Sequence, residues 1–211
     1  MNRSGVAVRH HAADRTGRAD GNERLTAATG AVLLVLFAVE GFTILGIHRM
    51  LTLHFFAGML LIGPAVLKTC STCYRFARYY LGDREYRRKG PPAVVLRLLG
   101  PFVVLSTLGV LGTGVALAVA GPGQRWWLLL HKASFIIWFG VMAVHVLVYA
   151  PRLPRLLSAD LRGRAADRAR ATLAGRGMRW SLLTLSLAAG LFLAMLTVHR
   201  VAGWQTPFAG R

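Results

Sequence analysis

The stretch "HKASFIIWFGVMAVH" (residues 131–145) places a histidine at each end of an apolar run. It belongs to a longer apolar segment, residues 127–149, which reaches the roughly 20 residues that an α-helix needs to cross the hydrocarbon core of a bilayer. Apolar runs of this length are typical of transmembrane helices. The segment therefore predicts a membrane-spanning helix that carries two imidazoles.

The rest of the chain has the same character. Its 211 residues are 55% hydrophobic and yet carry a formal net charge of +18. A soluble domain is rarely both so apolar and so basic, whereas apolar spans separated by arginine-rich stretches account for both properties. The sequence predicts an all-α integral membrane protein with about five transmembrane helices, the other four at residues 25–47, 51–69, 98–120 and 180–199.

Basic residues decide which side each loop faces. Segments 1–24, 74–97 and 151–179 carry five, seven and eight Lys and Arg residues, and all three fall on the same side of five spans. Lys- and Arg-rich loops stay in the cytoplasm. We therefore expect a multi-pass protein with a cytoplasmic N-terminus and an external C-terminus, whose arginines contact the anionic lipid surface rather than nucleic acid.

This topology divides the chain into four parts. Residues 1–24 are polar and non-periodic, which predicts a disordered basic cytoplasmic tail. Residues 25–150 form a four-helix membrane core. Residues 151–179 form a basic cytoplasmic loop, in which 158–177 is a candidate interfacial helix. Residues 180–211 supply a fifth transmembrane helix and a short outer tail.

Three histidines lie at defined depths in this topology. The second and fourth spans both run inward, so His54 and His131 each lie about one turn below the outer surface. His145 lies about 21 Å further along the fourth span, at 1.5 Å per residue, near the cytoplasmic face. Because fourteen residues make nearly four turns, His131 and His145 share one face of the helix.

Two imidazoles on one face, one near each membrane surface, match the spacing with which diheme cytochromes b hold two stacked haems. Each iron then needs a second axial ligand from another helix. His54 has the right depth for the outer haem, but fourteen residues beyond it the chain has Lys68 in place of a histidine. We therefore expect one haem b, with His54 and His131 as iron ligands, and His145 as a ligand only if a second haem is present.

Other polar and small residues fit a haem site without requiring one. Lys132 is a cation at the outer level, suited to a haem propionate or to anchoring the helix at the interface. Glu40 lies in the outer half of the first span, where a carboxylate is costly without a function or a partner. It is a candidate for a proton or quinone step, or for pairing with a neighbouring helix. Glycines would let a flat macrocycle approach the backbone at Gly58, Gly63, Gly109, Gly112 and Gly114.

Three stretches carry a family resemblance: "HFFAGMLLIGPAVLK" (54–68), "YRFARYYLGDREYRRKGPP" (74–92) and "LHKASFIIWFGVMAVHVL" (130–147). They resemble the cytochrome b561-like group of small bacterial membrane cytochromes, and within it an uncharacterised set of membrane proteins of this length. The resemblance spans about residues 25–150 and makes the fifth helix an addition to a haem-binding four-helix bundle. It implies a bacterial plasma (inner) membrane location, haem b, and electron exchange with quinone or a partner oxidoreductase. The departure from the pattern at Lys68 favours one haem over two.

The sequence thus favours an electron-transfer subunit over a stand-alone enzyme, and two other classes of function stay open. The first is a non-haem membrane anchor or assembly subunit, whose histidines hydrogen-bond across helix interfaces. The second is an ion or metal transporter that uses Glu40, His48, His54 and His199. The pair Cys70 and Cys73 is a weak zinc signal without a second such pair.

Overall fold

The structure is a computed structural model, and it describes residues 4–88, 94–149 and 176–205. These residues are helical apart from short turns and contain no strand, which confirms the all-α prediction for this part of the chain. The elements are α1 (Ser4–Leu45), α2 (Ile47–Tyr80), α3 (Arg84–Arg88), α4 (Val94–Ala120), α5 (Arg125–Tyr149), α8 (Arg176–Thr197), the 3₁₀ helix η2 (Val198–Val201) and α9 (Ala202–Gln205).

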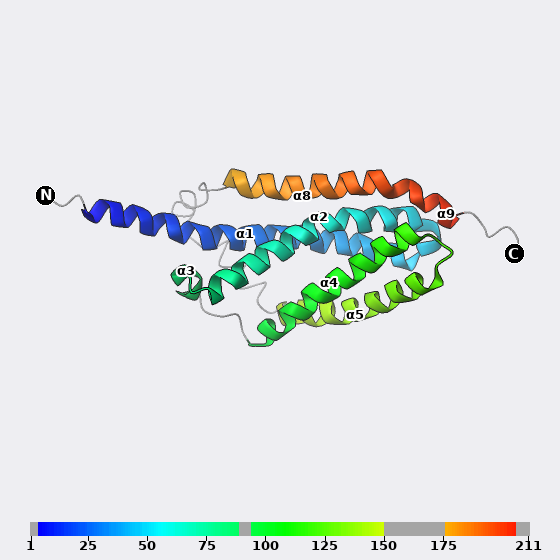
Figure 1. The fold of residues 1–211 in the computed structure, drawn as a ribbon, viewed down its shortest axis with the longest axis horizontal. Coiled ribbons are helices and arrows are strands. Elements are labelled where there is room, and N and C mark those ends of the chain that lie inside the picture. Colours follow the sequence, from blue (N-terminus) through cyan, green and yellow to red (C-terminus); the bar gives the residue numbers. More distant parts are fainter. Residues whose placement is uncertain (1–3, 89–93, 150–175, 206–211) are drawn as a thin grey trace, which may run out of the picture.

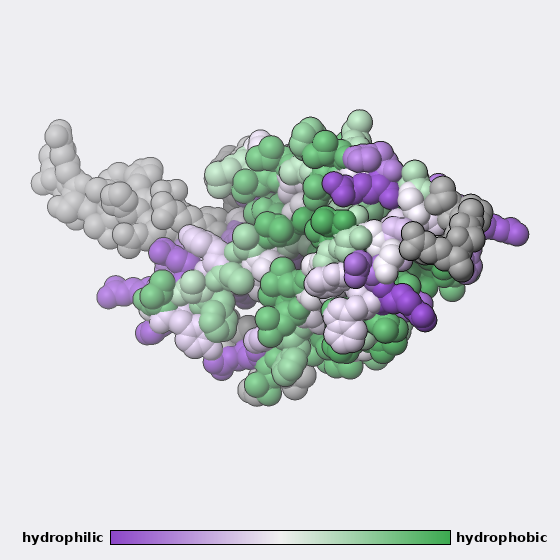
Figure 2. Space-filling view, turned by 45° about the vertical axis from the view of Figure 1, so that its right-hand side comes forward, coloured by the Kyte–Doolittle hydropathy of each residue, from purple (hydrophilic) through white to green (hydrophobic). Residues whose placement is uncertain are grey.

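Within the described ranges, five helical segments are long and apolar enough to cross a membrane. They are Gly21–Leu45, Ile47–Tyr80, Arg97–Ala120, Arg125–Val148 and Gly177–Gln205. Each overlaps one predicted span, so the prediction of a five-helix multi-pass membrane protein is confirmed at this level. Figure 2 shows apolar side chains over the middle of one face, with hydrophilic side chains gathered toward its two ends.

Two helices extend further than the sequence predicts. α1 begins at Ser4, so the structure continues the first helix through the segment expected to be disordered. That segment lacks proline and contains many Ala and Arg residues, which are strong helix formers. α2 has 34 residues and measures about 50 Å at 1.5 Å per residue, so it exceeds a hydrocarbon core of about 30 Å. The candidate interfacial helix at 158–177 lies outside the described residues, apart from the start of α8.

Two tight turns bring the site residues together. Gly46 joins α1 to α2: its carbonyl oxygen accepts hydrogen bonds from the N–H groups of Arg49 and Met50, and the chain reverses there. Gly121 ends α4 with a φ of +78°, a left-handed conformation that favours glycine, just before α5 begins. Each turn makes an antiparallel pair of helices, α1 with α2 and α4 with α5.

The α1 and α2 pair lies between α8 on one side and the α4 and α5 pair on the other (Figure 1). The contact of α2 with α8 is close enough for backbones to touch. A Cβ atom added to Gly63 would lie 2.0 Å from the Ser186 carbonyl oxygen, and one added to Gly190 would lie 2.3 Å from that of Leu60. Small residues allow such approach between membrane helices. α8 packs directly on α2, and Gly63 lies in this contact.

The α4 and α5 pair meets α1 through an aromatic contact at middle depth. The ring centroids of Phe37 and Trp138 lie 4.7 Å apart, and Trp138 Nε1 donates a hydrogen bond of 3.1 Å to Thr107 Oγ1. Trp138 is buried. The space between the levels of His131 and His145 is therefore filled partly by protein side chains.

Candidate functional site

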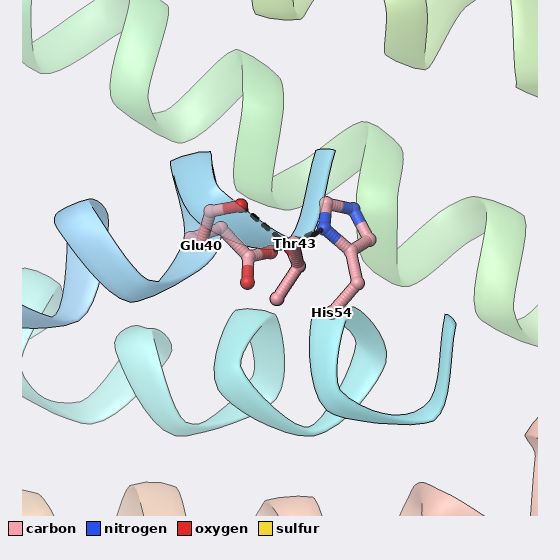
Figure 3. A network of polar contacts seen from close by, with 3 residues as sticks. All are labelled: Glu40, Thr43 and His54. Atoms are coloured by element: carbon pink, nitrogen blue, oxygen red, sulfur yellow. Dashed lines mark hydrogen bonds and ion pairs between the residues drawn. The ribbon is translucent and has the colours of Figure 1, made fainter. Parts of the chain in front are cut away.

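His54 on α2 is held by two residues of α1 (Figure 3). Its Nδ1 lies 2.9 Å from Thr43 Oγ1 and 3.2 Å from Glu40 Oε1. Thr43 is fully buried and donates its hydroxyl proton to the backbone oxygen of Glu40, at 2.6 Å. Because that proton is already used, the Thr43 oxygen accepts the hydrogen bond from His54. Nδ1 of His54 therefore carries the proton, and Nε2 keeps its lone pair.

His131 on α5 is held in the same way by α4. Its Nδ1 lies 3.2 Å from Thr113 Oγ1, which donates its own proton to the carbonyl oxygen of Gly109 at 2.8 Å or Val110 at 3.1 Å. These contacts likewise place the ring proton on Nδ1 and leave the Nε2 lone pair available.

The two imidazoles meet edge to face between the helix pairs, with ring centroids 6.4 Å apart and ring planes at 68°. A metal ion bound by both rings would need two metal–nitrogen bonds of about 2 Å, plus about half a ring at each end, which adds to about 6 Å. Metal-binding histidines usually donate their other N–H to a carboxylate, a backbone oxygen or a similar acceptor. Both rings here have such acceptors, so the donor set and its spacing fit a bis-histidine metal.

Two of the predicted glycines lie beside the side chains of this polar site. A Cβ atom at Gly114 would lie 3.1 Å from His131 Cε1, and one at Gly58 would lie 3.2 Å from Glu40 Oε1. Gly114 therefore lets His131 stand close to α4, and Gly58 leaves room for the Glu40 carboxyl group beside α2. At Gly109 and Gly112 a Cβ atom would meet nothing within 4 Å.

The two oxygens of Glu40 differ in their surroundings. Oε1 faces His54, whereas Oε2 is buried without a hydrogen-bond partner among the described residues. A buried polar atom left without a partner costs free energy. The carboxyl group is thus paired through one oxygen and can hold a proton on the other.

The remaining predicted residues lie apart from this pair. Lys132 is exposed beside His131, at the end of α5 near the Gly121 turn. His48 and His199 are also exposed, so of the four residues considered for a transporter the structure brings together Glu40 and His54. Cys70 and Cys73 are free and exposed on α2. The described ranges contain no group of three or more His, Cys, Asp or Glu side chains able to hold a metal ion.

At the level of His145, Lys68 joins α2 to α1. Its Nζ donates a hydrogen bond to the Thr26 carbonyl oxygen, and Gly30 leaves room for the amine, since a Cβ there would lie 2.9 Å from Nζ. Lys68 also lies within electrostatic range of His145 on α5. Thr26 Oγ1 and Ser71 Oγ, 2.9 Å apart, extend this polar contact between the helices.

Sequence reasoning missed the hydroxyl groups that hold the imidazoles. Thr43 follows Glu40 by three residues and Thr113 stands within "LGTGVAL", and both residues are ordinary in membrane helices, where threonine bonds its own backbone. In the sequence, the only signal for these contacts was a hydroxyl-bearing residue near the depth of each histidine. No family model, curated protein or solved structure matches the chain.

Proposed function

We propose that the protein is a membrane electron carrier that binds one haem b between His54 of α2 and His131 of α5. The observation that supports this is the pair of imidazoles, 6.4 Å apart, each with its Nδ1 occupied by a threonine hydroxyl. Two protein nitrogens complete the coordination of an iron that a porphyrin already binds through four nitrogens. Two histidine ligands give an iron suited to electron transfer rather than oxygen binding.

The polar partners of the two rings would set their orientation and basicity. Thr43 and Glu40 hold Nδ1 of His54, and Thr113 holds Nδ1 of His131, which leaves Nε2 of each ring as the nitrogen that would bind the iron. Such outer partners tune a metal centre as much as its ligands do. Haem b, when bound, supplies a reversible one-electron couple. Lys132, exposed beside His131, would meet a propionate at the outer surface.

The residues at the inner level favour one haem per chain over two. Lys68 stands where a second ligand is expected, and its amine is committed to the Thr26 carbonyl oxygen. Trp138, packed on Phe37, occupies part of the path between the two levels. A haem at the outer level lies roughly 20 Å from the inner one, given fourteen residues of helix. We therefore place electron exchange on the outer side of a bacterial plasma membrane, with quinone or a partner oxidoreductase, the N-terminus being cytoplasmic.

Optical spectroscopy of the purified protein tests this function. We expect a Soret band, a sharp α-band on reduction and one haem per chain in a pyridine haemochrome assay. His54→Ala and His131→Ala should each abolish haem uptake, whereas His199→Ala, at an exposed histidine, should retain it. Two haems per chain, with one lost in His145→Ala, would contradict the single site. A colourless preparation would favour the membrane anchor.

A further inference from the structure

A groove of about 300 Å³ lies between α4 and α5 on the surface of the helix bundle. This volume is at the lower end of small-molecule sites. Several lining side chains are more than half exposed, among them Leu105 and Ile137. Because both helices are membrane spans, the groove opens toward lipid. Its lining residues are Phe102, Leu105, Ser106, Gly109, Ser134, Ile137 and Val141.

The groove is apolar except for two hydroxyl groups, and both have already used their protons. The Ser134 proton has two acceptors within reach, the backbone oxygen of His131 at 2.9 Å and Thr113 Oγ1 at 2.8 Å, and Ser106 Oγ donates to the backbone oxygen of Val103 at 3.3 Å. A hydroxyl group has one proton to donate and two lone pairs to accept with. The groove therefore offers acceptors, and it suits an apolar ligand that brings its own O–H.

One of these hydroxyl groups is linked to the candidate iron ligand. Ser134 Oγ lies 2.8 Å from Thr113 Oγ1, which lies 3.2 Å from His131 Nδ1. When Ser134 donates its proton to Thr113, a ligand hydrogen-bonded to Ser134 is connected to the imidazole through two further hydrogen bonds. The groove is therefore joined by hydrogen-bonded hydroxyl groups to a residue of the candidate site, which suits a ligand that exchanges electrons with it.

We propose that this groove binds a lipid-soluble hydroquinone, with its ring between α4 and α5 and one of its O–H groups donating to Ser134 Oγ. A hydroquinone combines an apolar body with O–H donors, whereas an acyl chain has no donor and a quinone has only acceptor oxygens. The groove therefore prefers the reduced form to the oxidised form. The proposal rests on the proposed function for its redox meaning, but the binding itself does not require haem.

The test uses the full-length protein in detergent and a photoreactive hydroquinone probe, with cross-linked residues located by mass spectrometry. We expect cross-links on α4 and α5 within the groove. Unlabelled hydroquinone should compete for them, and its dimethyl ether, which lacks O–H groups, should not. Ser134→Ala should weaken hydroquinone binding about threefold to tenfold, the range for one hydrogen bond. Ser186→Ala is the matched control, because Ser186 Oγ also donates to a carbonyl oxygen one turn back, on α8.

A second pair of variants tests the groove by its shape. Gly109 lines the groove and a Cβ atom there meets nothing within 4 Å, so Gly109→Leu places a side chain in the groove and should reduce cross-linking at least tenfold. Gly112→Leu is the control, since Gly112 is equally open and exposed on α4 but does not line the groove. Cross-links located elsewhere, or equal competition by the dimethyl ether, would overturn the proposal and indicate a purely apolar occupant.

Haem content, measured on the same preparations, separates the two proposals. If the chain binds haem and the probe does not label the groove, the hydroquinone site is wrong and the electron carrier stands. If the probe labels the groove and competition follows the O–H groups in a protein without haem, the site stands and the electron carrier is wrong.

Discussion

Thr43 Oγ1 lies 2.9 Å from Nδ1 of His54, so a buried hydroxyl group on α1 fixes the direction of an imidazole on α2. Thr113 does the same for His131 from α4. Each imidazole is therefore positioned by the helix with which its own helix forms a pair. The two pairs then meet at the rings, which explains how a site forms between helices that otherwise make few contacts.

Thr43→Val should weaken haem binding by about tenfold, because loss of an outer partner of a metal ligand typically costs 10-fold to 100-fold in affinity. Valine has nearly the same shape but accepts no hydrogen bond from Nδ1. Haem loss to excess apomyoglobin measures the effect. Thr43→Ser keeps the hydroxyl group and should bind haem as the parent does. Equal haem loss from Thr43→Val and the parent would show that Thr43 does not position His54.

Glu40→Gln should leave the reduced haem spectrum intact and slow haem reduction by hydroquinone severalfold. Glutamine retains the shape and an acceptor oxygen for His54 but cannot ionise, and the buried Oε2 of Glu40 has no partner among the described residues. Stopped-flow absorbance at the α-band measures the rate, and dithionite provides a reduction that needs no proton acceptor. If hydroquinone reduces Glu40→Gln and the parent equally fast, Glu40 only supports His54.

Gly63→Ala should lower the melting temperature by several degrees, because its Cβ would lie 2.0 Å from the Ser186 carbonyl oxygen and would force α8 away from α2. Overpacking of this kind costs about 1–3 kcal/mol. Thermal unfolding in detergent measures the change. Gly100→Ala on α4, where a Cβ meets nothing within 4 Å, should unfold like the parent. A Gly63→Ala protein with unchanged stability would contradict the close contact of α2 with α8.

Helix geometry explains why the pairing of His54 with His131 could be anticipated. Depth in a membrane follows from counting residues along a helix at 1.5 Å each, and both histidines lie about one turn from the start of a predicted span. Residues at equal depth on inward-running helices can meet if the helices are neighbours. The same counting showed that Lys68 occupies the position at which a ligand for a second haem would be expected.

The position of α8 could not be predicted in this way. Five apolar helices have similar compositions, and which of them touch depends on where small residues coincide on two surfaces. Gly63 and Gly190 coincide on α2 and α8, but the sequence alone made Gly63 equally suitable for a cofactor. Thr43 and Thr113 were missed for a related reason. In the sequence, a threonine that holds a histidine of another helix cannot be distinguished from one that bonds only the backbone of its own helix.

Electron exchange is expected on one side of the membrane only. A haem between His54 and His131 lies near the outer surface in the proposed topology. Roughly 20 Å separates it from the inner level, given the fourteen residues to His145, and that gap is long for one electron-transfer step. A membrane-impermeant reductant should therefore reduce the haem quickly in right-side-out vesicles and slowly in inverted ones.

Equal rates in the two kinds of vesicle would contradict this expectation in one of two ways, and a labelling experiment distinguishes them. A single cysteine introduced in the basic segment 151–179, with Cys70 and Cys73 replaced by serine, can be labelled by an impermeant maleimide from the side that it faces. Both native cysteines are exposed, so their replacement leaves the core intact. Labelling from outside would show that the topology is reversed. Labelling from inside, together with fast reduction from inside, would require a second electron carrier at the level of His145, where Lys68 would have to leave the Thr26 carbonyl oxygen to make room.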